Sequence, residues 1–161
     1  MDRSAIREDR MNQQSRVADG HHQNRGGALA QAQGPLKILL AESAGATRQR
    51  MQQVLKGHHY HVTCVADGFE VLCRLPELRP DILMMSCALP RLSGAQVCTL
   101  LRQSPDFSDL RIVLLSEQPN FLDSVNAERV AADGCLPKPF RSSELSAVLS
   151  GLAAKAEAAA Q

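Results

Sequence analysis

Residues 80–94 read PDILMMSCALPRLSG, in which an unbroken apolar run leads into a loop that contains proline and glycine. Such a run, bounded by turn-forming residues, is typical of a strand that is buried on both faces of a sheet. We therefore predict a strand over residues 82–85, followed by a loop that begins at Ser86.

The same pattern of short apolar segments recurs on both sides of this stretch. Strands are predicted over residues 37–41, 61–65, 82–85, 111–116 and 134–136, and helices over residues 48–56, 69–75, 95–103, 121–132 and 142–154. This alternation predicts an α/β fold, a doubly wound five-stranded parallel sheet with five helices. Pro76 is expected to weaken or end the second helix. Phe69 and Leu100 are expected to face the core.

The two ends of the chain differ from this core in composition. Residues 1–34 are rich in polar residues and glycine, and they contain too little apolar area to offset the entropy of ordering, so we predict a disordered arm. Residues 35–154 form the predicted α/β domain, and residues 155–161 are an alanine-rich extension.

Composition and charge exclude several classes of function. The net charge of +1 gives no electrostatic reason to bind nucleic acid. No apolar run approaches the ~18 residues that span a bilayer, so no membrane segment is expected. The five cysteines favour free, buried thiols in a reducing compartment, and we expect a cytoplasmic protein.

Polar residues directly follow four of the predicted strands. In an open parallel sheet the functional crevice lies at the carboxyl ends of the strands, so these side chains should converge. The candidate pocket residues are Glu42, Ser43, Ser86, Ser116, Glu117 and Lys138.

Three segments together resemble the receiver domain of bacterial response regulators. They are residues 80–94, with their proline and glycine spacing, residues 133–140, which read DGCLPKPF, and more weakly residues 67–70. The resemblance covers about residues 36–152. It implies the flavodoxin-like fold of CheY-like receivers and a place in two-component signal transduction.

The resemblance implies that Ser86 stands where receivers keep the aspartate that accepts a phosphoryl group. Of the acidic pair that helps to hold magnesium in the family, Glu42 is retained and Ser43 is not acidic. A serine hydroxyl without a base is a poor nucleophile, and Mg²⁺ prefers several oxygen ligands. We therefore expect a protein that is not an enzyme, has no cofactor, and binds Mg²⁺ weakly or not at all.

The other pocket positions are retained in part. Ser116 matches the hydroxyl residue that binds the phosphoryl group in the family, and Lys138 matches its lysine. A buried ammonium needs a partner, so we predict that Lys138 pairs with Glu42. Glu117 is an alternative second carboxylate for the pocket.

The resulting interpretation is a pseudo-receiver that binds another signalling protein, namely a kinase, a regulator or an output protein, without phosphorylation and without a DNA-binding domain. The family's usual contact face would lie on the helix over residues 121–132, the last strand and the last helix. Its candidate residues are Phe121, Val125, Cys135 and Leu145. The same face could also form a homodimer.

Two alternatives remain open at this stage. The chain could be an atypical receiver that still responds to a phosphoryl group, or its vacated pocket could bind a small ligand such as a nucleotide.

Two further features of the sequence have simpler explanations than a functional site. His58, His59 and His61 fit a solvated turn better than a metal site, and Cys87 fits buried filler better than a reactive thiol.

Overall fold

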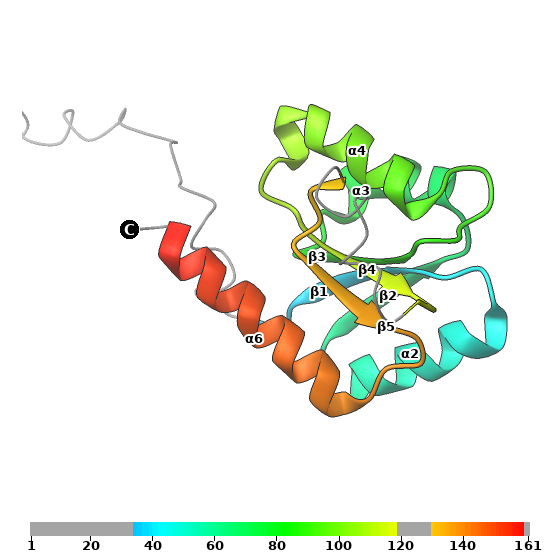
Figure 1. Ribbon diagram of the computed structural model, residues 1–161, viewed down its shortest axis with the longest axis vertical. Coiled ribbons are helices and arrows are strands. Elements are labelled where there is room, and N and C mark those ends of the chain that lie inside the picture. Colours follow the sequence, from blue (N-terminus) through cyan, green and yellow to red (C-terminus); the bar gives the residue numbers. More distant parts are fainter. Residues whose placement is uncertain (1–33, 119–129, 160–161) are drawn as a thin grey trace, which may run out of the picture.

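The computed structural model describes residues 34–118 and 130–159 (Figure 1). Residues 1–33 of the predicted arm lie outside the described residues. So does most of the predicted helix over residues 121–132, including Phe121 and Val125.

All five predicted strands are present and run parallel in one sheet. They are β1 (Lys37–Ala41), β2 (His61–Val65), β3 (Ile82–Ser86), β4 (Arg111–Ser116) and β5 (Gly134–Pro137). The strand order is β2-β1-β3-β4-β5, so the order reverses after β1 and the chain winds in two directions. The predicted doubly wound parallel sheet is confirmed.

Helices cover both faces of this sheet, as Figure 1 shows. On one side lie α3 (Gly68–Leu78) and α4 (Gly94–Gln103), which is followed by a short 3-10 turn over Pro105–Phe107. On the other side lie α2 (Gly45–Gly57) and α6 (Ser142–Ala159). Within the described residues, no helix is both long and apolar enough to cross a membrane.

Of the two outcomes expected at Pro76, the end of the helix is not observed, because α3 continues through Pro76 to Leu78. Because Pro76 has no N–H, the helical hydrogen bond to the Leu72 carbonyl is not made, and the helix runs only two residues beyond the proline. The helix ends instead at Arg79, which adopts a left-handed conformation and donates its N–H to the carbonyl of Leu75.

Successive side chains of each strand point to opposite faces of the sheet, so the core has one layer on each face. In β1, Ile38 and Leu40 pack with α2 and α6, whereas Leu39 and Ala41 pack with α3 and α4. Every residue of β3 is buried, as expected for a central strand that is covered on both faces.

Two large side chains that were expected in the core are exposed. Phe69 is 51% exposed and Leu100 is 45% exposed. A nearby buried position in α3 is Val71, two residues after Phe69. In α4 one is Cys98, two residues before Leu100. In short helices several apolar residues compete for the inward face, and the packing of the sheet decides between them. Phe69 instead lies under the Arg91 guanidinium, 5.2 Å from its ring centroid.

The cysteines do not all share one environment, contrary to expectation. All five are free thiols, but only Cys98 is fully buried, and Cys73 is exposed on α3. Cys73 points outward because the neighbouring Val71 and Leu75 occupy the inward face of the helix. The histidine turn behaves as predicted, since His59 and His61 are exposed before and at the start of β2.

Candidate functional site

The structure brings most of the candidate pocket residues together at the carboxyl ends of the strands. Glu42 follows β1, Ser86 ends β3, Ser116 ends β4 and Lys138 follows β5. A cavity of about 270 Å³ is bordered by Ser86, Ser116, Glu117 and Lys138. Ser43 is exposed and does not border this cavity.

A buried ion pair joins two strand ends at the centre of the site. The Nζ atom of Lys138 lies 2.8 Å from Oε2 of Glu42, and the two side chains are 9% and 3% exposed. This contact confirms the predicted pairing of the lysine with Glu42. Because β1 and β5 are separated by β3 and β4, the ion pair spans the top of the sheet.

Lys138 also fixes the hydroxyl of Ser86. The Nζ atom donates a hydrogen bond to the Ser86 Oγ at 2.8 Å, and the backbone N–H of Ala88 points to the same oxygen at 3.3 Å. The lysine is already paired with a carboxylate and acts as a donor, so it offers no lone pair to remove the serine proton. The Ser86 hydroxyl is therefore fixed as a hydrogen-bond acceptor and is not activated as a nucleophile.

The second carboxylate oxygen of Glu42 is occupied as well. The backbone N–H of Ala44 donates to Oε1 of Glu42 at 3.0 Å, while Arg48 donates to the Glu42 carbonyl at 2.7 Å. Mg²⁺ usually takes several oxygen ligands that include carboxylates. Among the described residues of this site, Glu42 is the one buried carboxylate. Across the described part of the chain, no group of three or more His, Cys, Asp or Glu side chains could hold a metal.

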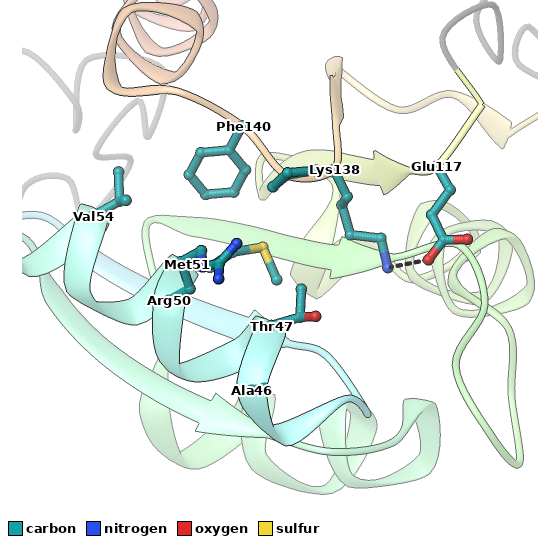
Figure 2. Close-up of a pocket in the computed structure, with 9 residues that line it drawn as sticks. Ala46, Thr47, Arg50, Met51, Val54, Glu117, Lys138 and Phe140 are labelled. Atoms are coloured by element: carbon teal, nitrogen blue, oxygen red, sulfur yellow. Dashed lines mark ion pairs between the residues drawn. The ribbon is translucent and has the colours of Figure 1, made fainter.

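Glu117, the alternative second carboxylate, lies at the rim and not in the centre. Its side chain is 83% exposed, and its Oε1 is 3.9 Å from the Lys138 Nζ (Figure 2). Water screens such an exposed charge, so Glu117 contributes far less than Glu42 to holding the lysine. The neighbouring Ser116 hydroxyl accepts a hydrogen bond from the Gln118 N–H at 3.0 Å.

The loop after β3 is held close to Ser86 by a glycine. The N–H of Gly94 donates to the Cys87 carbonyl, and a Cβ at this position would lie 2.5 Å from the Ser86 carbonyl oxygen. Ser93 then caps α4 in a reciprocal pair with Gln96. The glycine and the cap together place the start of α4 directly beside the site.

The Cys87 thiol beside the pocket has low reactivity. Burial raises the pKa of Cys87 to about 11, with a further upward contribution from Cys135. A thiol with this pKa is almost wholly protonated at neutral pH and reacts slowly. Cys87 is half-buried at the edge of the cavity, and its raised pKa agrees with the interpretation of an unreactive thiol.

Two candidate contact residues can be placed in the structure. Cys135 in β5 is half-buried, and burial raises its thiol pKa. Leu145 is fully buried against the sheet, so its assignment to a contact surface is wrong. It occupies the inward stripe of α6, because an amphipathic helix turns its leucines toward the core.

A second cavity was not expected from the sequence. It has a volume of about 450 Å³ and lies between α2 and the turn after β5, as Figure 2 shows. It shares Lys138 and Glu117 with the smaller cavity beside Ser86. The spacing of Thr47, Arg50, Met51 and Val54 along α2 was the available signal, but the opposing wall depends on how the turn packs.

The chain is similar in sequence to response regulators. The chain is 34% identical over 118 residues to the response regulator MprA of Mycobacterium sp. strain KMS, an alignment that covers 73% of this chain and 50% of MprA. It is 28% identical over 110 residues to protein PilG of Pseudomonas aeruginosa, covering 68% of this chain and 82% of PilG. The chain thus spans about half the length of the MprA relatives.

Solved structures agree with these relatives. The receiver domain of the sensor histidine kinase PA1611 from Pseudomonas aeruginosa superposes with a TM-score of 0.68 at 26% identity, covering 75% of this chain and 99% of that domain. A family model for the response regulator receiver domain matches residues 38–150. By sequence and by fold, the chain belongs to the family of response regulator receiver domains.

Proposed function

We propose that this receiver domain works without phosphorylation and acts in the cytoplasm as a protein-binding module of two-component signalling. The observation that carries the proposal is the contact of Lys138 with both Glu42 and Ser86 at 2.8 Å. Binding of a protein partner, and not a phosphoryl group, would then carry the signal.

The chemistry of phosphoryl transfer supports this proposal. Transfer to a receiver needs an anionic carboxylate nucleophile, together with a divalent cation that neutralises the developing charge. Here the residue at the strand end is Ser86, and both oxygens of Glu42 are engaged. The PA1611 receiver, by contrast, was solved with a magnesium ion in its active-site cleft. In this chain the Lys138 ammonium takes the place of a cation beside Glu42, so we expect weak or absent Mg²⁺ binding.

The proposed contact face is the edge strand β5 with the outer side of α6. Among the described strands β5 pairs only with β4, and an edge strand is a common site for a partner to bind. Ala147 and Ser150 are exposed on α6, and Cys135 of β5 is half-buried. The partner is a kinase, a regulator or an output protein, and a second copy of the chain is the alternative.

Capture of partners from the native cell with a matched set of variants tests this function. Ser86→Ala removes the hydroxyl, and Ala147→Arg with Ser150→Arg adds charge to the outer side of α6. The proposal predicts that wild type and Ser86→Ala capture the same protein, and that the α6 variant loses it. Loss of that protein in Ser86→Ala, with the fold intact by circular dichroism, would show that the signal depends on this hydroxyl.

A magnesium titration is the second test of the proposed function. Chemical shifts of the Glu42 and Ser86 amides should stay unchanged in the wild type as Mg²⁺ is raised to millimolar levels. The variant Ser43→Asp with Ser86→Asp restores two carboxylates and should show saturable shifts at the same amides. Saturable shifts in the wild type would contradict the proposal.

A further inference from the structure

The cavity between α2 and the turn after β5 has the properties of a small-molecule site. Its volume of about 450 Å³ falls within the range of ~300–1,000 Å³ that is usual for ligand pockets. It lies beside the Ser86 cavity, with which it shares Glu117 and Lys138, and its walls are apolar on one side and polar on the other. The residues that line it include Thr47, Arg50, Met51, Val54 and Phe140.

The base of the cavity can accommodate the aromatic ring of a ligand. Met51 and Phe140 are buried at its base, and in Figure 2 the Phe140 ring faces α2 across the cavity. A thioether and a phenyl ring both make favourable contacts with an aromatic ring. Val54 completes the apolar wall on the same side of α2.

The rim of the cavity supplies a positive charge and a hydroxyl. Thr47 and Arg50 lie three positions apart on α2 and therefore share one side of the helix. Within the described residues, neither side chain has a hydrogen bond or an ion pair. Lys138, in contrast, is already engaged by Glu42. Arg50 is thus the cation at this rim that is left for a ligand.

We infer that this cavity binds a small aromatic acid, with its carboxylate at Arg50 and Thr47 and its ring against Met51 and Phe140. The guanidinium fork and the hydroxyl can both donate to one carboxylate. Glu117 lies at the other end, beside Lys138, and favours an orientation with the acid group away from it. The inference does not depend on whether Ser86 accepts a phosphoryl group.

Titration followed by amide chemical shifts tests the site directly. The probes are 1-naphthoate, its neutral analogue 1-naphthamide and the cation 1-naphthylmethylammonium, which share one ring system. We expect saturable shifts at Thr47, Met51 and Phe140 with 1-naphthoate and a dissociation constant near or below about 1 mM. The amide should bind more weakly, and the cation should bind least.

Variants separate charge recognition from general apolar binding. Arg50→Gln should weaken 1-naphthoate about fivefold and leave 1-naphthamide unchanged. Lys56→Gln removes the same charge from the same helix outside the cavity and should change neither probe by more than about twofold. Val54→Trp fills the cavity and should abolish binding of both, with the dispersed amide spectrum as the check of folding.

Three results would overturn the inference. The first is the absence of shifts at these residues with every probe. The second is equal binding of the acid and the amide. The third is an Arg50→Gln variant that binds 1-naphthoate as tightly as Lys56→Gln does.

Discussion

Glu42→Gln is the substitution that most directly probes the ion pair at the centre of the site. The two charged groups lie 2.8 Å apart and are almost fully buried. At an effective dielectric constant of ~20 their attraction is about 6 kcal/mol. Most of this gain is offset by the cost of removing both ions from water.

The substitution leaves the lysine in place without its anion. The ammonium keeps the Ser86 hydroxyl and the amide oxygen of the substituted side chain, and Glu117 remains 3.9 Å away. We therefore expect the free energy of unfolding to fall by about 1–3 kcal/mol, which is the usual cost of an imperfectly satisfied buried charged group. Urea unfolding should show a lower midpoint with an unchanged slope.

Two further variants make this test specific. Glu77→Gln removes a carboxylate from an exposed pair with Arg74 at 3.8 Å and should cost less than about 0.5 kcal/mol. Lys138→Met in the Glu42→Gln background removes the isolated charge and should recover part of the lost stability. The reasoning is refuted if Glu42→Gln costs no more than Glu77→Gln, or if the double variant is less stable than Glu42→Gln alone.

Three other predictions concern the loop after β3, the opposite end of the sheet and the thiols. Gly94→Ala should destabilise the fold by about 1–3 kcal/mol, because its Cβ would lie 2.5 Å from a backbone oxygen at the end of β3. Gly151→Ala in α6 meets nothing within 4 Å and should raise stability by up to about 1 kcal/mol; equal effects of the two changes in urea unfolding would contradict this account. Asp133→Asn should cost about 1–3 kcal/mol in the same assay, because this carboxylate accepts from an arginine of α4 at 2.7 Å and from a backbone N–H of β4 at 2.8 Å, and an unchanged midpoint would count against it. Iodoacetamide should label exposed Cys73 first at pH 8, whereas Cys87, whose burial-raised pKa of about 11 leaves it protonated there, should react only as the pH approaches that value; early labelling of Cys87 in peptide mass spectra would refute this order.

The strands and the site could be predicted from sequence because both depend on local pattern. Apolar runs locate buried strands, and parallel strands bring the residues that follow them to one edge. The pairing of Lys138 with Glu42 could be predicted for a physical reason, since a buried ammonium requires an anion.

The details that depend on packing could not be predicted in this way. The helix phases that leave Phe69 and Leu100 exposed are chosen by contacts across the sheet, not by spacing alone. Leu145 was misplaced for a different reason, because the spacing of the leucines along α6 already indicates the inward face of that helix. The cavity against Phe140 arises where a turn meets a helix, and neither segment shows it by itself.

Intact mass after incubation with acetyl phosphate and Mg²⁺ tests most directly whether the Ser86 pocket is chemically silent. A receiver that carries an acceptor aspartate, treated in parallel, shows that the donor is active. For this chain the mass should remain that of the untreated protein. A gain of one phosphoryl group, whether removed by hydroxylamine as an acyl phosphate or stable as a serine ester at Ser86, would contradict the account.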